Sequence, residues 1–264
     1  MIHSARFEHA LSLVRAGEFE LALQAFRKLV DEARDGDPKT DYLYGELIAL
    51  TRLERVAEAR RLLDVFRRSV GDVDESRARA DLVEVQIDVL EEKWQQALSL
   101  SQKIVERYGE MLLHPHLRDV YEEVQWRRGV LLAAFGKFNE ALPLLQESLC
   151  FESLVTGELY FQLGRCYLDA ADYEHARESF TKALEIGLDD ASAGTSHFCL
   201  GTILMRKEAY ARAVEELTIA ESCSSRAAVP NPHIYKALAV SYAKLGMRKE
   251  ARRYAQLAGV SLPG

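Results

Sequence analysis

The sequence predicts an all-α protein built from repeated helical hairpins, and three observations lead to this prediction. The 264-residue chain is rich in Ala, Leu, Glu and Arg and has only six prolines, a mixture that favours helices. In the segment 158–188, apolar residues recur at helical spacing on both sides of a short turn, Ala171-Asp172-Tyr173. Similar turns recur along the chain at a nearly constant interval, which indicates internal repeats.

Seven alanines define the repeat, and each follows the last residue of a predicted turn by three positions. They are Ala22, Ala59, Ala97, Ala141, Ala176, Ala213 and Ala251. Their spacings are 37, 38, 44, 35, 37 and 38 residues, and random sequence does not keep such a period through seven copies. We therefore expect a single domain, 1–264, with repeats at about 3–34, 39–69, 75–108, 116–151, 156–188, 191–222 and 231–263.

The first three repeats differ in how clearly they follow this pattern. Asp35-Gly36-Asp37-Pro38 is a strong helix stop after the first repeat, and the segment 71–74 breaks the chain after the second. The third repeat is the poorest match because Asp81 and Asp88 stand at the positions that Tyr160 and Tyr167 occupy in the segment 158–188. Either the register of this helix is shifted by one residue or the helix is tilted. Its second helix, 94–108, is clear.

The interval of 44 residues contains an insertion at 109–121. We expect a loop that ends at His114-Pro115, followed by an elongated helix from about 116 to 135. His114 and His116 have no neighbouring Cys or carboxylate in the sequence, so we predict no metal site there.

The segment 158–188 also resembles the tetratricopeptide repeat (TPR). Tyr160 stands where that family prefers Trp, and Leu163-Gly164, Tyr167, Ala176 and Phe180 follow at the family's intervals. The resemblance is strong in repeats four to seven, fair in one and two, and weak in three. It implies a right-handed α-solenoid of about seven helix-turn-helix units, in which each unit buries its apolar face against its neighbours.

Several classes of function are disfavoured by composition and motifs. The formal charge of −7, from 34 basic and 41 acidic residues, argues against general binding to a nucleic-acid backbone. GxxxxGK[ST], GxGxxG, HExxH and GxSxG are all absent from the sequence, so we predict no enzyme and no cofactor. Cys166 and Cys199 fall in apolar helical patterns and are expected to be buried, reduced thiols.

The sequence contains no membrane signal. The first twenty residues lack the apolar run of a signal peptide, and no stretch reaches the length of a membrane-spanning helix. We therefore expect a cytoplasmic protein without a membrane partner.

The resemblance further implies that the first helix of each repeat lines a concave groove that binds a peptide or helix of a partner protein. In the family's register, groove positions hold aromatic and basic residues in an otherwise acidic chain. Those expected to bind the partner are Phe7, Tyr44, Trp126, Arg127, Phe161, Arg165, Phe198, Arg206 and Lys236. Such a groove suits a peptide with apolar anchors and acidic neighbours.

Alternatives remain open at this point. A shift of one residue would turn the aromatics into packing residues between helices. The chain would then serve better as a scaffold that self-associates through its open ends, and RNA binding is a third, weaker reading. Binding of a chaperone's C-terminal carboxylate is excluded, because the positions that would supply its Lys/Asn/Arg set hold other residues, such as Phe161, Cys199 and His233.

Gly164 tests the predicted register. If this glycine lies where the two helices of its hairpin cross, Gly164→Leu overpacks the crossing and lowers the free energy of unfolding by about 1–3 kcal/mol. Thermal denaturation measures this change. An unaltered melting temperature would show that the register is wrong.

Overall fold

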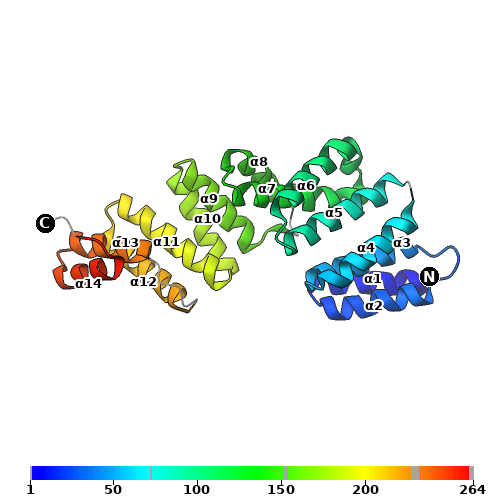
Figure 1. Cartoon of the computed structure of the whole chain (residues 1–264), viewed down its shortest axis with the longest axis horizontal. Helices are drawn as coiled ribbons and strands as arrows, with labels where there is room; N and C mark the ends of the chain where they lie inside the picture. Colours follow the sequence, from blue (N-terminus) through cyan, green and yellow to red (C-terminus); the bar gives the residue numbers. More distant parts are fainter. Residues whose placement is uncertain (1, 72, 152–153, 227–231, 262–264) are drawn as a thin grey trace. The chain divides into compact units, whose positions relative to one another are not determined.

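The computed structural model describes residues 2–71, 73–151, 154–226 and 232–261. Within these ranges the chain forms fourteen α-helices and two short 3-10 helices, with no strand. The helices group into two compact units, Met1–Leu131 and Leu132–Gly264, and the boundary lies within α7. Figure 1 labels the helices, and each unit is described by itself.

The first unit contains three complete hairpins and most of α7. Its helices are α1 (Ile2–Arg15), α2 (Phe19–Glu32), α3 (Lys39–Arg52), α4 (Val56–Val70), α5 (Asp74–Leu90), α6 (Trp94–Tyr108) and α7 (Arg118–Ala134). From α1 to α6, each helix packs against the next one. The first helices of the hairpins are also in contact, α1 with α3 and α3 with α5.

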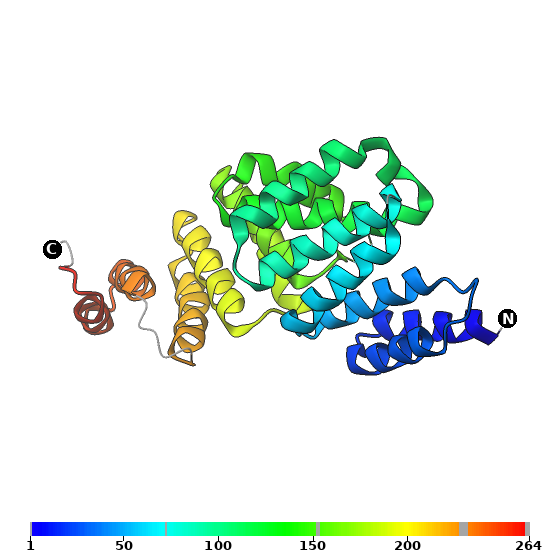
Figure 2. The ribbon, with the colours of Figure 1, turned by 45° about the vertical axis from the view of Figure 1, so that its right-hand side comes forward.

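The second unit continues the same pattern. Its helices are α8 (Phe138–Ser148), α9 (Gly157–Asp169), α10 (Tyr173–Ile186), α11 (Asp190–Arg206), α12 (Tyr210–Arg226), α13 (Pro232–Lys244) and α14 (Arg248–Ala258). Each packs against the next. In Figure 2 the last hairpin, orange to red, is seen nearly end-on with its two helices side by side.

Every hairpin turn has the same hydrogen-bonded geometry. In the fifth, Ala171 adopts a positive φ of 56°, its N–H donates to Leu168 O (3.1 Å), and the Asp172 N–H donates to Tyr167 O (2.9 Å). This is the Schellman arrangement that satisfies the last carbonyls of a helix. The equivalent bonds form at all seven turns, whose positive-φ residues are Gly17, Glu54, Glu92, Gly136, Ala171, Glu208 and Gly246.

The positive-φ residue lies five positions before each repeat alanine, so the structure confirms the predicted period. The seven alanines are at most 1% exposed. Glycines also lie where two helices cross closely. A Cβ built on Gly164 would lie 2.8 Å from the Phe180 ring, and one built on Gly201 would lie 2.7 Å from Leu217 Cγ. Gly164 is therefore a packing residue, as the sequence indicates.

Repeat three keeps the common register. Its turn residue Glu92 has φ 59°, and Ala97 is fully buried. Asp81 and Asp88 stand where repeat five has Tyr160 and Tyr167, and α4 supplies their partners: Arg67 Nη2 lies 3.2 Å from Asp81 Oδ1, and Arg60 Nη2 lies 3.0 Å from Asp88 Oδ1. Ion pairs thus substitute for apolar contacts between α4 and α5, and no shift of register is needed.

The insertion differs in part from its prediction. Two 3-10 helices, Gly109–Leu113 and Pro115–Leu117, occupy most of it, and α7 begins at Arg118 rather than near 116. With 17 residues, α7 is no longer than α5 or α11, so the first helix of this repeat is not elongated. Buried Leu112 and Leu117 hold the 3-10 segment against the core formed by α5, α6 and α7. The extra chain is therefore packed, not an open loop.

The cysteines expected to be buried are buried. Burial raises the pKa of the Cys166 and Cys199 thiols to about 11, so both remain protonated at neutral pH.

That the whole chain forms a single solenoid domain stays a prediction. The seventh repeat's Pro263 and the Pro230 before it lie outside the described residues.

The turn geometry predicts that Ala171→Gly stabilises the protein. A residue with a Cβ is strained at positive φ, and glycine is not, so the free energy of unfolding should rise by about 1 kcal/mol. Ala170→Gly is the matched control, because Ala170 has an ordinary φ of −70° and its replacement should be neutral or destabilising. Urea denaturation of both variants measures the difference. Equal effects at the two positions would contradict the role assigned to the turn.

Candidate functional site on the first helices of the first unit

Three first helices of the first unit bring charged and aromatic side chains into one contact network. In α7, Asp119, Glu123 and Arg127 are spaced by four residues and so lie along one stripe of the helix. Side chains of α3 and α5 complete what we name the first-helix network. Its members are Asp41, Tyr44 and Arg52 of α3, Arg79 and Gln86 of α5, and Asp119, Glu123 and Arg127 of α7.

Glu123 is the centre of this network. Its Oε1 receives hydrogen bonds from Arg127 Nε (2.9 Å) and Gln86 Nε2 (3.3 Å), and Arg52 Nη2 lies 3.5 Å away. The Gln86 amide oxygen in turn accepts a bond from Thr51 Oγ1 (3.1 Å). Glu123 is only 8% exposed. One buried carboxylate thus faces two guanidinium groups.

The charge on Arg127 is incompletely compensated. Burial lowers the pKa of its guanidinium; the negative charge of Glu123 opposes this shift, and the positive charge of Arg52 adds to it. Arg52 retains 39% of its side-chain surface and Arg127 retains 15%. This end of the network can therefore accept a further anionic group.

Tyr44 and Arg79 form the neighbouring part of the network. The Arg79 guanidinium lies 5.2 Å above the Tyr44 ring, and its Nη1 lies 3.1 Å from Asp41 Oδ1. Arg79 Nη2 also donates to the backbone oxygen of His116 (3.1 Å). Burial raises the pKa of the Tyr44 hydroxyl, and the negative charge of Asp119 raises it further. The tyrosine therefore stays protonated and able to donate.

Asp119 stands at the acidic end. The residue is exposed by surface area, yet desolvation by surrounding protein atoms raises the pKa of its carboxyl, against the opposing effect of Arg79. The network is thus polarised along the helices, with Asp41 and Asp119 toward one end and Arg52 and Arg127 toward the other.

Trp126 borders the cationic end. Its ring is half-buried, and the Arg127 guanidinium lies 5.1 Å from the ring centroid. Its indole nitrogen is buried and has no acceptor among the described residues. A buried donor without an acceptor costs about 1–3 kcal/mol, so an acceptor brought by a partner would relieve this cost after a small movement of the ring.

The other expected residues divide between packing and exposure. Phe7 is half-buried and packs between Phe26 (6.2 Å between ring centroids) and Tyr42 (5.3 Å). Phe161 is 8% exposed and packs edge-on against Phe180. At these two positions the aromatic rings act as packing residues, because they fill the space between helices. That Phe7 and Phe161 bind a partner stays a prediction.

In the second unit, the remaining candidates are not joined into a network. Arg165 lies over the Phe138 and Phe161 rings and bonds to Gln162. Phe198 packs against the core of the last two hairpins. Arg206 is exposed and lies 5.0 Å from the Tyr173 ring, and Lys236 is exposed on α13.

Sequence reasoning missed Gln86 and Asp119. A signal for Asp119 was present: it precedes Glu123 and Arg127 at steps of four residues, the spacing of one helix face. Gln86 had no such signal, because its role follows from the packing of α5 beside α3 and α7.

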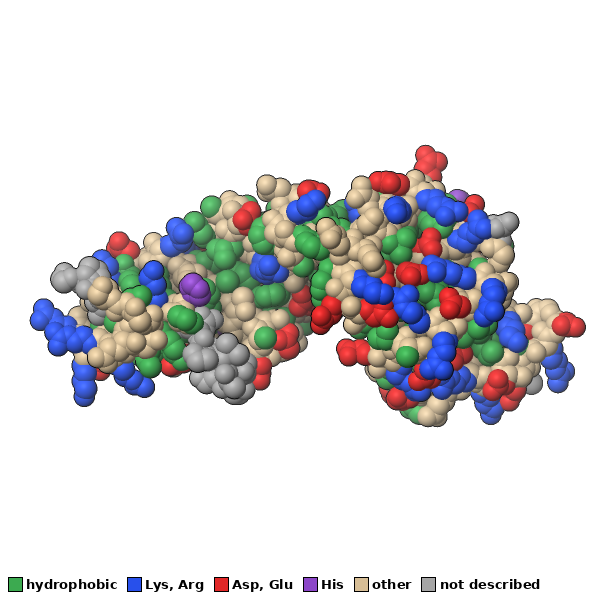
Figure 3. Space-filling model, viewed as in Figure 1, with side chains coloured by type: hydrophobic (Ala, Val, Ile, Leu, Met, Phe, Trp, Pro, Cys, Tyr) green, Lys and Arg blue, Asp and Glu red, His purple; other side chains and the backbone are tan. Residues whose placement is uncertain are grey.

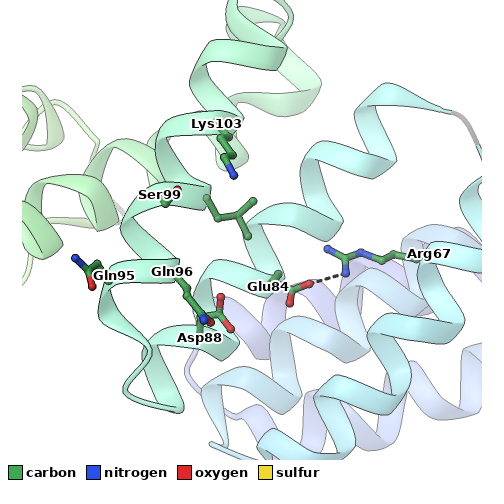
Figure 4. A pocket seen from close by; sticks show the side chains of 8 residues that line it. Arg67, Glu84, Asp88, Gln95, Gln96, Ser99 and Lys103 are labelled. Carbon is green, nitrogen blue, oxygen red and sulfur yellow. Dashed lines mark ion pairs between the residues drawn. The ribbon is translucent and has the colours of Figure 1, made fainter.

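A separate polar depression of about 520 Å³ lies over α4, α5 and α6 and includes none of the expected residues. Figure 4 shows Arg67 reaching from α4 toward Glu84 of α5, with which it forms an ion pair. Asp88 at its floor pairs with Arg60. Its main charges are therefore already paired, and it is a weaker candidate.

Two further findings limit the chemistry. Among the described residues, no three His, Cys, Asp or Glu side chains are grouped so that they could hold a metal ion. His116 instead lies 2.7 Å from Glu75 and stacks on His114. No helix in the described ranges combines the length and apolarity needed to cross a membrane.

Comparison with known proteins agrees with this architecture. Two family models, both described as tetratricopeptide repeat, match residues 7–80 and 157–189. These matches show that the chain contains tetratricopeptide repeats, and the seven equivalent turns repeat the same hairpin geometry along the described residues. No curated protein matches the sequence.

Solved structures share the fold at low sequence identity. The apo form of RapI has a TM-score of 0.64 at 13% identity, over 98% of this chain and 76% of that one. MamA has a TM-score of 0.54 at 18% identity, over 69% and 90%. YrrB, described as a TPR protein with an unusual peptide-binding site, has a TM-score of 0.52 at 15% identity, over 69% and 84%.

The network predicts that Glu123→Gln destabilises the first unit. Arg127 and Arg52 would then face each other without a carboxylate between them, at a cost of about 2–4 kcal/mol, somewhat below that of a fully buried pair. Glu122→Gln is the matched control, since Glu122 pairs with Arg118, whose side chain is 69% exposed, and its loss should cost less than about 1 kcal/mol. Chemical denaturation measures both. Similar losses for the two variants would contradict the central role of Glu123.

Proposed function

We propose that this protein is a non-enzymatic, cytoplasmic adaptor that binds a peptide or helix of a partner protein on the first-helix network of its first unit. The fold supports the general part of this proposal, because TPR units present side chains from successive first helices on one continuous face. The specific part rests on one observation: two guanidinium groups, Arg52 and Arg127, share the single carboxylate of Glu123.

The partner's chemistry follows from this arrangement. A carboxylate on the partner would bridge Arg52 and Arg127 and neutralise the positive charge that Glu123 alone does not balance. Trp126 and Tyr44, both partly accessible, offer apolar contact beside it. The acidic end at Asp41 and Asp119 favours a basic or amide group there, so the polarised network also orients the bound segment.

Other interpretations receive less support. Self-association through the ends of the repeat array would leave the first-helix network unused. Binding of RNA is disfavoured by the net charge of −7 and by the carboxylates within the network. Enzymatic activity has no assembled nucleophile and base among the described residues of the network.

Selection from a displayed peptide library tests the proposal. Peptides that bind the wild-type protein should share an acidic residue next to an apolar one. Their affinity for Arg52→Gln should fall at least about tenfold, because a charge-assisted hydrogen bond contributes about 1.5–3 kcal/mol. The fluorescence emission of Trp126 should change on binding. It is measured in a Trp94→Phe background, because Trp94 is the other tryptophan of the chain and lies on the second helix α6.

Arg61→Gln is the matched control. Arg61 is an exposed arginine on second helix α4 whose side chain bonds to its own helix at Ala57 O. Affinity should stay within about twofold of wild type. Selected peptides without acidic residues, or equal losses for Arg52→Gln and Arg61→Gln, would rule out this groove. A rise in mass with concentration in light scattering would favour the scaffold instead.

A further inference from the structure

The last hairpin, α13 and α14, differs in charge from the rest of the chain. Residues 232–261 contain six basic side chains and one acidic one, a formal charge of +5, whereas the remainder carries −12. Four of the cations belong to α14, whose sequence is RKEARRYAQLA. Figure 3 shows basic side chains gathered over this hairpin, while basic and acidic side chains alternate over the first unit.

Helical spacing places these four cations on one face. Arg248, Lys249, Arg252 and Arg253 stand at positions i, i+1, i+4 and i+5 and are all exposed, and we name them the basic face of α14. The opposite face buries Ala251, Tyr254 and Ala255 against α13 and α12. The four cations therefore lie on the solvent-exposed side of the helix.

The basic face lacks internal carboxylate partners. In the first unit, arginines such as Arg27, Arg60 and Arg67 each contact two or more carboxylates. Within the described residues, none of the four cations of the basic face forms an ion pair within 4.0 Å; Arg253 contacts only the Tyr254 ring, at 5.4 Å. Four like charges held within two helical turns repel one another, and a bound anionic group would relieve that repulsion.

We propose that the basic face of α14 is a second docking surface, which binds an acidic segment of another protein. The exposed Leu257 continues the stripe of Lys249 and Arg253 by one turn, and it is 50% exposed. A ligand that fits this stripe carries closely spaced Asp or Glu side chains followed by an apolar residue. This surface is separate from the first-helix network and does not depend on it.

The charge of the whole chain selects a protein segment over larger polyanions. An α-helix of 11 residues is about 16 Å long, so a short acidic segment covers the basic face without approaching the other helices. A nucleic-acid backbone or an anionic membrane extends beyond the Debye length of about 8 Å at physiological salt and would also meet the acidic side chains of residues 132–231 in the same unit, whose formal charge is −7.

Fluorescence anisotropy with a short fluorescein-labelled peptide of alternating Glu and Leu tests this proposal on the full chain. Wild-type protein should bind the peptide, more weakly as salt increases. The variant Arg248→Gln, Lys249→Gln, Arg252→Gln and Arg253→Gln should bind at least about tenfold more weakly, since it removes four charge contacts. Its thermal unfolding should match wild type, because the buried face of α14 is unchanged.

Two control variants make the result specific. Lys28→Gln, Arg61→Gln, Arg68→Gln and Lys103→Gln together remove the same number of charges from exposed positions of the first unit and should leave the peptide affinity nearly unchanged. Because this peptide also fits the first-helix network, Arg52→Gln serves as a background in which the α14 variant should still weaken binding at least about tenfold. No binding by wild type, a loss in the first-unit variant equal to that of the α14 variant, or no effect of the α14 variant in the Arg52→Gln background would overturn the proposal.

Single-stranded RNA and phosphatidylserine-containing vesicles are the remaining probes. Both should bind more weakly than the peptide. If either binds more tightly and loses binding in the α14 variant, the surface serves that polyanion and the proposal for a protein segment is wrong.

Discussion

The whole structure depends on the close approach of two helices within each hairpin. That approach requires a fully buried alanine, such as Ala176, and a turn in which one residue adopts a positive φ. The turn satisfies carbonyl oxygens that the helix end would otherwise leave without donors. Because the same geometry recurs seven times, the spacing between hairpins is nearly constant, and side chains at equivalent positions of successive first helices come within contact distance.

This repeated scaffold tolerates exchange of apolar packing for charge. In repeat three, Asp81 and Asp88 stand where repeat five has Tyr160 and Tyr167, and Arg67 and Arg60 of the preceding hairpin compensate their charges. The backbone register is unaffected, because the turn at Glu92 and the buried Ala97 set it independently. Polar contacts between neighbouring repeats can therefore vary while the hairpins stay the same.

The two proposed surfaces use charge in different ways. In the first-helix network, each charge is partly buried and partly compensated, so a ligand must match its geometry around Glu123 and Arg127. On α14 the charges are exposed and lack carboxylate partners among the described residues, so a ligand need only be acidic and short. The first arrangement favours specificity, and the second favours rapid, salt-dependent association.

The sequence by itself determined the class of fold and the period of the repeats. Small residues at crossings and turn residues act over a few positions, so Ala176, Gly164 and Ala171 report local geometry that a pattern can reveal. The same reasoning located Tyr44, Trp126 and Arg127 on the helices that carry the network.

Only the tertiary structure decided which of those side chains act together. Phe161 and Trp126 occupy equivalent positions, yet Phe161 is buried against Phe180 whereas Trp126 is half-buried beside Arg127, because exposure depends on the neighbouring helix and not on position within the repeat. Glu123 contacts Arg52 across 71 residues of sequence, and Gln86 contacts Thr51 across 35. Burial and contact at such distances arise from stacking, which no single-repeat pattern contains.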